Sequence, residues 1–409
     1  MQRFECIFTT LSKQISKLKF PLNTFPAIYR GIWATLMIVF ISLANNQDAL
    51  AQFTHKRISS NLMVNGKVAY GFLIPHHLEM EILNSHFTAY EISISKATYG
   101  RTRWEYMYNY PVIGIAYWYS SLGTSPYLGN AHALMPYIDF PLTYGKEMRI
   151  FFRTALGIGY ITNHFDRLEN YKNIAIGSHW NAAVAFTLEM KQKVSERFIV
   201  SLGLGFNHFS NGSMKTPNYG INIPNASASL SYRLSKENPY FRKKLLPELR
   251  PFYFDGKKSL DLNIAGGLGY KNMNAEMEGK FLAWDIFTGI MKDVSYKSSV
   301  GVGLDASYDG TDEIALRQKY GETSENNFEM IKTGFEVGYA LNMSRISFVG
   351  NLGYYLSGRY QGDGKIYEKI GIWCEISRDL FAHVTLKAHA GRADFLTLGI
   401  GYKIELIYY

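Results

Sequence analysis

Apolar and polar residues alternate along most of this chain in segments of about ten residues. Residues 197–210 show the pattern most clearly. One face of this segment carries Phe198, Val200, Leu202, Leu204 and Phe206. The other face is small or polar, with Ser201, Gly203, Gly205 and Asn207. Because side chains of a strand point alternately to its two faces, this pattern is typical of a transmembrane β-barrel strand with an apolar outer surface.

The same alternation predicts two groups of strands. The first group lies at about residues 66–74, 87–96, 111–120, 130–142, 149–160, 178–190, 197–210 and 225–234. Residues 236–257 break the pattern with spaced prolines and a basic cluster, which is typical of a linker. The second group lies at about residues 258–268, 279–290, 295–307, 329–342, 345–356, 366–377, 380–390 and 395–408. Since eight strands suffice to close a small barrel, we expect an all-β fold of two tandem eight-stranded antiparallel barrels. One barrel of about sixteen strands is the alternative.

The N-terminal region has the features of a secretory signal peptide. A basic start precedes an apolar run at residues 32–43, and Ala49-Leu50-Ala51 then offers a cleavage site. The sequence therefore predicts a signal peptide at 1–51. The predicted units that follow are a first barrel at 52–235, a linker at 236–257 and a second, degenerate barrel-like half at 258–409.

Composition favours an outer-membrane barrel over a soluble periplasmic sandwich. The chain has 30 Tyr, 26 Phe and 36 Gly, which suits aromatic girdles and tightly paired strands. After the leader, no segment has 18 consecutive apolar residues, so no transmembrane helix is expected. Cys374 would be the only cysteine of the exported chain, which leaves no intrachain disulfide to form.

Charge and histidine content narrow the choice of partners. The 43 Lys and Arg exceed the 34 Asp and Glu, giving a net charge of +9. This modest excess is the only feature that would support nucleic-acid binding, and we expect none. His76-His77-Leu78-Glu79 follows a proline and is interpreted as a solvated loop rather than a metal site. We expect neither a metal nor a cofactor.

The strand at residues 197–210 ends in candidate catalytic residues. Continuing the apolar row by two and by four residues reaches His208 and Ser210, so both side chains point outward at the end of the strand. A serine hydroxyl becomes a good nucleophile when an adjacent base takes its proton. Ester hydrolysis also needs nearby donors for the oxyanion that develops. Asn211-Gly212, Pro217-Asn218 and Gly220-Ile221 follow directly.

These residues closely resemble the signature of the lipid A 3-O-deacylase (PagL) family, whose members are eight-stranded outer-membrane barrels. The family hydrolyses the ester-linked 3-hydroxyacyl chain of lipid A. The resemblance covers roughly residues 60–235 and is sharp over 207–221. It implies that Ser210 is the nucleophile and His208 its general base. The residues it implies for the oxyanion and for orienting the substrate are Asn211, Gly212 and Asn218.

The chain departs from the family pattern at one position. The acid that orients the histidine in the family falls at Asn222 here. An amide carbonyl can hold the histidine tautomer, as Asn does in Cys-His-Asn sites, but it cannot stabilise the imidazolium by charge. Reduced activity, a different third partner (Asp166 or Glu169) and lost activity therefore stay open. Related chains are often called acyloxyacyl hydrolases, and the motif does not choose between the ester bonds of lipid A.

The second half lacks the same chemistry. His389 has no serine two places on, and its position in the alternation places it on the inner face. We interpret this half as structural or substrate-gathering. The predicted function is that of an outer-membrane serine esterase that removes an ester-linked acyl chain from lipid A of lipopolysaccharide. The alternative is a non-catalytic barrel, a scaffold, adhesin or porin, with a relic motif. The sequence does not indicate an oligomeric state.

Overall fold

The computed structural model describes residues 62–98, 102–123, 126–144, 147–234, 259–274, 279–323, 326–362 and 364–408. The predicted signal peptide and the predicted linker lie outside these residues. Eight strands build the first barrel: β1 Leu62–Phe72, β2 His86–Ala97, β3 Val112–Ser120, β4 Ala131–Pro141, β5 Met148–Ile161, β6 Trp180–Lys193, β7 Phe198–Ser210 and β8 Ile221–Arg233. Eight more build the second: β9 Ser259–Lys271, β10 Phe281–Ser295, β11 Ser298–Asp309, β12 Lys332–Met343, β13 Ile346–Ser357, β14 Ile366–Glu375, β15 Leu380–His389 and β16 Arg392–Tyr408.

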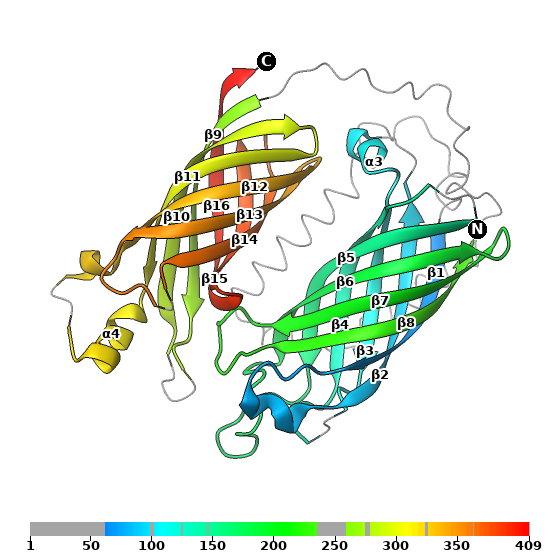
Figure 1. Ribbon diagram of the computed structural model, residues 1–409, viewed down its shortest axis with the longest axis horizontal. Helices are drawn as coiled ribbons and strands as arrows, with labels where there is room; N and C mark the ends of the chain where they lie inside the picture. Colours follow the sequence, from blue (N-terminus) through cyan, green and yellow to red (C-terminus); the bar gives the residue numbers. More distant parts are fainter. Residues whose placement is uncertain are drawn as a thin grey trace, which may run out of the picture.

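Each group of strands closes on itself (Figure 1). In the first barrel β8 returns to pair antiparallel with β1, with Ala228 opposite Val68. In the second, β16 pairs antiparallel with β9, with Ile400 opposite Gly266. The prediction of two eight-stranded antiparallel barrels is confirmed. The alternative of one large barrel is wrong, because the last strand of each group completes its hydrogen bonds with the first strand of the same group.

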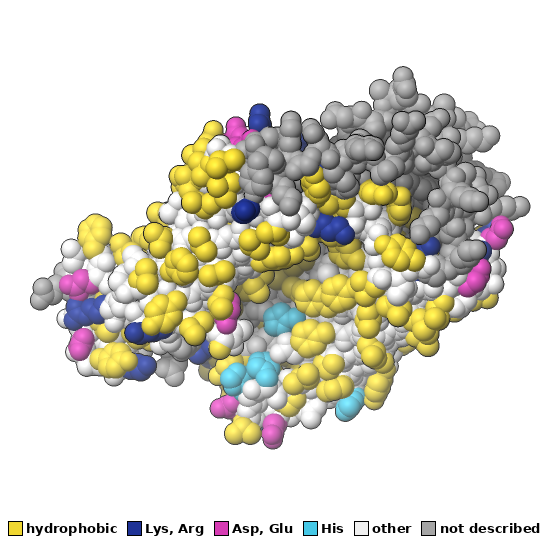
Figure 2. Space-filling view, turned by 45° about the horizontal axis from the view of Figure 1, so that its top comes forward, with side chains coloured by type: hydrophobic (Ala, Val, Ile, Leu, Met, Phe, Trp, Pro, Cys, Tyr) yellow, Lys and Arg dark blue, Asp and Glu magenta, His cyan; other side chains and the backbone are white. Residues whose placement is uncertain are grey.

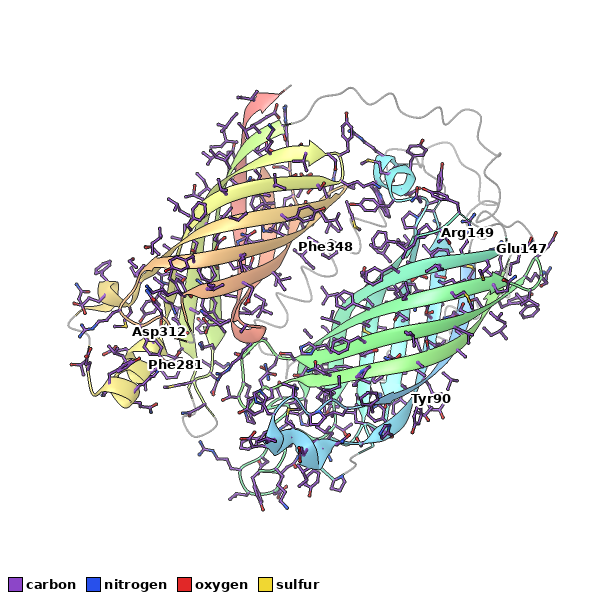
Figure 3. All side chains as sticks on the ribbon, viewed as in Figure 1. Tyr90, Glu147, Arg149, Phe281, Asp312 and Phe348 are labelled. Carbon is purple, nitrogen blue, oxygen red and sulfur yellow. The ribbon has the colours of Figure 1, made fainter. Side chains whose placement is uncertain are left out.

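The alternating side chains of each strand form the outer and the inner surface of the barrel. Along β1, Val68 and Tyr70 are 50% and 59% exposed, while the intervening Lys67 and Ala69 are buried. Figure 3 shows Tyr90 projecting outward from β2 in the same way. The outer surface in Figure 2 is largely hydrophobic, with charged side chains gathered mainly towards the ends. This distribution is the one expected for strands that face lipid.

Buried charged residues fill part of each barrel interior. In the first, Lys67 Nζ lies 2.6 Å from Glu189 Oε1, and Arg153 Nε lies 2.6 Å from Asp139 Oδ1. In the second, Lys369 Nζ lies 2.8 Å from Glu336 Oε1. An unpaired charge would be strongly disfavoured inside a barrel, so opposite charges occur together. Side chains fill eight-stranded barrels, and the aqueous channels of porins need more strands.

Helical turns occur only in the connections among the described residues. They are η5 Leu78–Leu83, α3 Arg103–Met107, α4 Asp312–Tyr320 and η6 Asn327–Met330. No helix in the described part of the chain is long and apolar enough to cross a membrane. The connection between β11 and β12, which contains α4 and η6, is the longest described connection of the second barrel (Figure 1).

The two barrels contact each other through connections at both ends. At one end, the β7–β8 loop touches the β9–β10 loop and the start of β16: the N–H of Asn272 donates to Ser213 O at 3.0 Å, and Ser213 Oγ donates to Ala393 O at 2.7 Å. At the other end, the Tyr108 hydroxyl, after α3, donates to Asn342 O at 2.9 Å. Corresponding ends therefore meet, so the β7–β8 loop and the β15–β16 turn lie at the same end of the molecule.

Candidate active site

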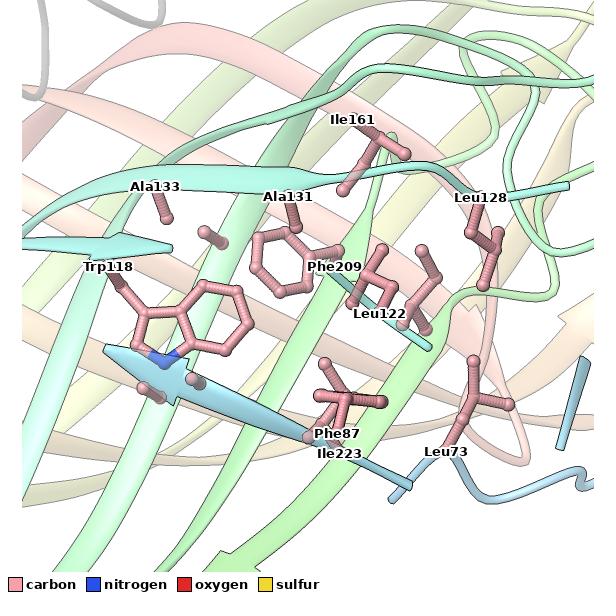
Figure 4. Close-up of a cluster of buried hydrophobic side chains, with 14 of the residues drawn as sticks. Leu73, Phe87, Trp118, Leu122, Leu128, Ala131, Ala133, Ile161, Phe209 and Ile223 are labelled. Carbon is pink, nitrogen blue, oxygen red and sulfur yellow. The ribbon is translucent and has the colours of Figure 1, made fainter. Parts of the chain in front are cut away.

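The end of β7 is anchored by an aromatic residue between the two candidate catalytic residues. Phe209 points inward and is 1% exposed. Its ring centroid lies 5.6 Å from that of Trp118, within a cluster of buried apolar side chains that also holds Leu122 (Figure 4). Because successive side chains alternate, this anchor directs His208 and Ser210 outward on either side of it. The outward direction predicted from the sequence is confirmed.

The pairing of β7 with β8 places a partner beside the histidine. His208 lies opposite Asn222 in the register, and His208 Nδ1 is 2.6 Å from Asn222 Oδ1. A carbonyl oxygen only accepts hydrogen bonds, so Nδ1 carries the proton and donates it. In the neutral ring Nε2 is then the basic nitrogen. The structure therefore brings Asn222 to the position that a triad's third residue occupies.

Two donors hold the hydroxyl of Ser210. Asn218 Nδ2 donates to Ser210 Oγ at 2.9 Å, and the backbone N–H of Gly212 donates to it at 3.2 Å. These bonds occupy the lone pairs of the oxygen and leave its own hydrogen free for a base. Within the described residues, Ser210 makes no direct hydrogen bond to His208. Catalytic hydrogen bonds of this kind often tighten only when substrate binds.

The loop after β7 is held by Asn211. Its side-chain Nδ2 donates to Ser178 Oγ at 3.0 Å and to Lys215 O at 2.8 Å, which uses both of its amide hydrogens. Its backbone N–H donates to Asn218 Oδ1 at 3.0 Å, so Asn218 is turned with its NH₂ group towards Ser210. Asn211 was predicted to act on the oxyanion or the substrate. In the structure its side chain holds the loop, and the donors to Ser210 Oγ come from Gly212 and Asn218.

Gly220 leaves space for the imidazole ring of His208. Gly220 has a φ of +86°, a conformation that L residues with side chains rarely adopt. A Cβ built on it would lie 2.8 Å from His208 Cε1. The backbone therefore approaches the edge of the imidazole closely and limits its position. This explains why the segment before β8 needs glycine at this point.

His76 joins the site from a distant part of the sequence. Asn222 Nδ2 lies 3.3 Å from His76 Nδ1, and His76 Nε2 lies 3.0 Å from Tyr219 O. An Nε2–H tautomer satisfies both contacts, because Nε2 then donates to the carbonyl and Nδ1 accepts from the amide. This arrangement fixes which end of the Asn222 amide faces His208. Sequence analysis placed His76 in a loop but did not connect it with the site, since 146 residues separate it from Asn222.

The two alternative acids lie elsewhere. Asp166 Oδ1 accepts from the backbone N–H groups of Leu168 and Glu169 at 2.8 and 2.9 Å. These backbone hydrogen bonds lower the pKa of Asp166 below its usual value. Neither Asp166 nor Glu169 contacts His208 in the described structure. Asn222, rather than either acid, is the partner of the histidine.

The second barrel shows no equivalent constellation in the residues that the structure describes. His389 points inward and is 6% exposed, as its position in the alternation predicts. Its Nδ1 lies 3.8 Å from Asp394 Oδ2, and its ring packs 5.8 Å from that of Tyr355. Within the same described ranges, no group of three His, Cys, Asp or Glu residues is arranged to hold a metal ion.

Comparisons with known proteins match each barrel to a family. The family described as "Lipid A 3-O-deacylase (PagL)" matches residues 88–233, and that described as "Acyloxyacyl hydrolase, C-terminal domain" matches residues 258–406. No curated protein matches the chain. The crystal structure of the outer membrane enzyme PagL is 16% identical, with a TM-score of 0.27, over 40% of this chain and 97% of that one. Neisserial surface protein A (NspA) is 10% identical, with a TM-score of 0.31, over 42% and 97%.

The two family matches correspond to the two closed barrels. The first spans β2 to β8 and includes the His208–Ser210 strand end, and the second spans β9 to β16. Both names denote ester hydrolases. The chain is therefore an outer-membrane β-barrel protein whose first barrel belongs to the lipid A 3-O-deacylase family and whose second belongs to the acyloxyacyl hydrolase C-terminal domain family.

Proposed function

We propose that this protein is a serine esterase that removes an ester-linked acyl chain from lipid A, with Ser210 as nucleophile and His208 as general base. The observation that carries the proposal is the 2.6 Å hydrogen bond from His208 Nδ1 to Asn222 Oδ1. It selects the tautomer whose Nε2 can accept a proton from a neighbouring hydroxyl. The family match to lipid A deacylases over residues 88–233 supports the choice of substrate.

The reaction proceeds through an acyl-enzyme. Ser210 Oγ attacks the ester carbonyl carbon while its proton passes to His208 Nε2. The carbonyl oxygen becomes an oxyanion, which the N–H of Gly212 and the NH₂ of Asn218 stabilise. The ester C–O bond then breaks, and His208 returns the proton to the departing alcohol oxygen. Water, deprotonated by His208, releases the fatty acid and restores Ser210.

The neutral amide of Asn222 makes this a triad without an acid. The hydrogen bond from His208 to Asn222 preserves the histidine tautomer that catalysis needs. In a serine protease, replacing the triad aspartate by asparagine gives the wrong tautomer and lowers kcat by about 10⁴-fold. What the amide does not supply is a negative charge beside the imidazolium. We therefore expect a working but slower enzyme than one with a carboxylate at this position.

The position of the site suits an acyl chain of a membrane lipid. His208 and Ser210 continue the outward apolar row of β7, at the end of the barrel that carries the β7–β8 loop. In outer-membrane barrels the longer connections face the cell exterior. A lipid in the outer leaflet would present its ester bonds at this rim and its acyl chains along the apolar outer surface.

Mass spectrometry of lipid A tests the proposal. Cells expressing the protein should lose one acyl chain from lipid A, and the lost mass identifies the chain. Ser210→Ala should abolish the loss. Ser201→Ala is the matched control, because Ser201 lies on the inner face of the same strand and its hydroxyl has no partner in the described structure. Unchanged lipid A with all three folded proteins in the outer membrane would favour the non-catalytic scaffold instead.

A further inference from the structure

We propose that the second barrel forms one wall of the acyl-chain site at Ser210, and that Leu386 and Leu396 discriminate between acyl chains of different length. The inference rests on the proposed esterase function and adds a determinant of its specificity. It assigns a role in substrate recognition to the half of the chain that has no catalytic constellation among its described residues.

The contact lies directly beside the candidate nucleophile. Gly212 donates its backbone N–H to Ser210 Oγ at 3.2 Å. On its other side, a Cβ built on Gly212 would lie 3.5 Å from Leu396 Cβ and 3.7 Å from Leu386 Cδ1. One glycine therefore separates the serine hydroxyl from the outer surface of the second barrel. Its φ of +63° favours glycine at this position, and a Cβ there would be in ordinary van der Waals contact with both leucines.

Hydrogen bonds fix the β7–β8 loop to the second barrel around this contact. Ser213 Oγ donates to Ala393 O at 2.7 Å, and the N–H of Asn272 donates to Ser213 O at 3.0 Å. The Thr216 hydroxyl donates to Asn272 Oδ1 at 2.7 Å. The loop that supplies the oxyanion donors is therefore tied to both β16 and the β9–β10 connection. These bonds set the distance between the nucleophile and the leucines.

The opposite ends of the barrels are also joined. The Tyr108 hydroxyl donates to Asn342 O at 2.9 Å, and the Arg103 guanidinium lies 3.9 Å from the ring centroid of Tyr296. Contacts at both ends hold the two apolar outer surfaces beside each other. Figure 2 shows the surface hollowed between the barrels and lined largely by hydrophobic side chains.

The two leucines have the chemistry of an acyl-chain wall. They are directly paired across β15 and β16, so their side chains form one apolar unit on the outer face. Both are half-buried, whereas Leu352 on β13 is 58% exposed on the outer surface. An acyl chain bound to Ser210 that runs down the outer face of β7 would contact this pair on one side and Phe206 on the other. One methylene in such an apolar pocket changes discrimination by about 10-fold or more.

Competition between substrates tests the assignment. The full-length protein in detergent micelles would receive an equimolar mixture of esters with long and short acyl chains, and mass spectrometry would measure the ratio of released fatty acids. Leu396→Ala and Leu386→Ala should each change this ratio by about tenfold. Leu396→Trp should shift it towards short chains. Hydrolysis of a water-soluble acetyl ester should stay within about twofold of wild type, because its acyl group does not reach the leucines.

Leu352→Ala is the control, since it removes the same atoms from the outer surface of the second barrel away from the site. If the Leu396 and Leu386 variants show the same ratio as Leu352→Ala, the second barrel does not contact the acyl chain and the inference fails. Failure of the proposed function is distinct, because the wild type would then release no fatty acid, or Ser210→Ala would release it as fast as the wild type. Heat-modifiable gel mobility would verify that each variant is folded. Should Leu396→Ala not fold, Leu396→Met and Leu396→Trp provide the same comparison.

Discussion

The last hairpins of the two barrels start alike and end differently. β7 and β15 each end near a histidine, His208 and His389. His208 points outward and lies opposite Asn222, whereas His389 points inward and lies opposite Arg392. Ten residues connect β7 to β8, but only Ala390-Gly391 connects β15 to β16.

The short turn explains why the second hairpin carries no site. Ala390 and Gly391 have φ values of +48° and +77°, as a two-residue type I′ turn requires. Such a turn has no room for a serine followed by oxyanion donors. The two barrels provide similar rigid hairpins, and the direction of one histidine and the length of one loop determine whether a candidate site forms.

The largest effect should distinguish the two histidines. His208→Ala should reduce kcat/KM for lipid A deacylation by roughly 10³-fold or more, because it removes the general base. His389→Ala should leave kcat/KM within about twofold and act on stability instead. Deacylation assays with purified proteins in micelles would measure both. An equal loss of activity in a folded His389→Ala protein would contradict the distinction drawn between the hairpins.

The next effect concerns the third residue of the triad. Asn222→Ala should lower kcat by roughly 100-fold, since the tautomer of His208 is no longer selected. Asn222→Glu should raise kcat by about tenfold by placing a charge beside the imidazolium. Steady-state kinetics on the same substrate would report both changes. An unchanged rate in Asn222→Glu, with substantial activity already present in the wild type, would show that this position does not limit the reaction.

Two glycine substitutions separate the position of His208 from backbone strain. Gly220→Ala places a Cβ 2.8 Å from His208 Cε1 and should displace the imidazole, with a loss of about 10- to 100-fold in kcat. Gly391→Ala is matched in backbone strain, since its φ is +77°, but its Cβ would meet no atom within 4 Å. It should leave kcat unchanged. Equal losses in both variants would mean that backbone strain, and not the position of His208, determines the effect.

The smallest effect belongs to His76. Replacing it by alanine removes the acceptor that orients the Asn222 amide, and we expect a loss of about three- to tenfold in kcat with little change in KM. His77→Ala is the neighbouring control, because His77 packs on Tyr219 without contacting Asn222. If both variants behave alike, the loop acts through general packing and His76 has no orienting role.

Local patterns were sufficient to predict much of the fold. Alternation along the chain identified all the strands of both barrels to within a few residues, and the same alternation gave the outward direction of His208 and the inward direction of His389. It placed the start of β1 near residue 66 rather than at Leu62, and the end of β10 near residue 290 rather than at Ser295. It also misplaced the start of β8, which begins at Ile221 rather than near residue 225. Pairing with β7 continues past Pro224, which a local pattern interprets as a break.

The remaining features depend on contacts between distant segments. The role of Asn211 in holding its loop requires knowing where Ser178 lies. The contact of His76 with Asn222 and that of Gly212 with Leu396 join residues from different hairpins and different barrels. No periodicity or motif encodes such contacts, because they arise only when the closed barrels are positioned in space.

The closure of each barrel on its own first strand also has a consequence for how such a chain can evolve. A sixteen-stranded barrel that lost half of its strands would expose two unpaired strand edges, which invite aggregation. Here β8 already pairs with β1, and β16 with β9. Recombination within the connecting segment could add or exchange either half as a complete hydrogen-bonded unit. An ancestral one-barrel enzyme could thus acquire a second barrel first as a neighbour and only later as part of its binding surface.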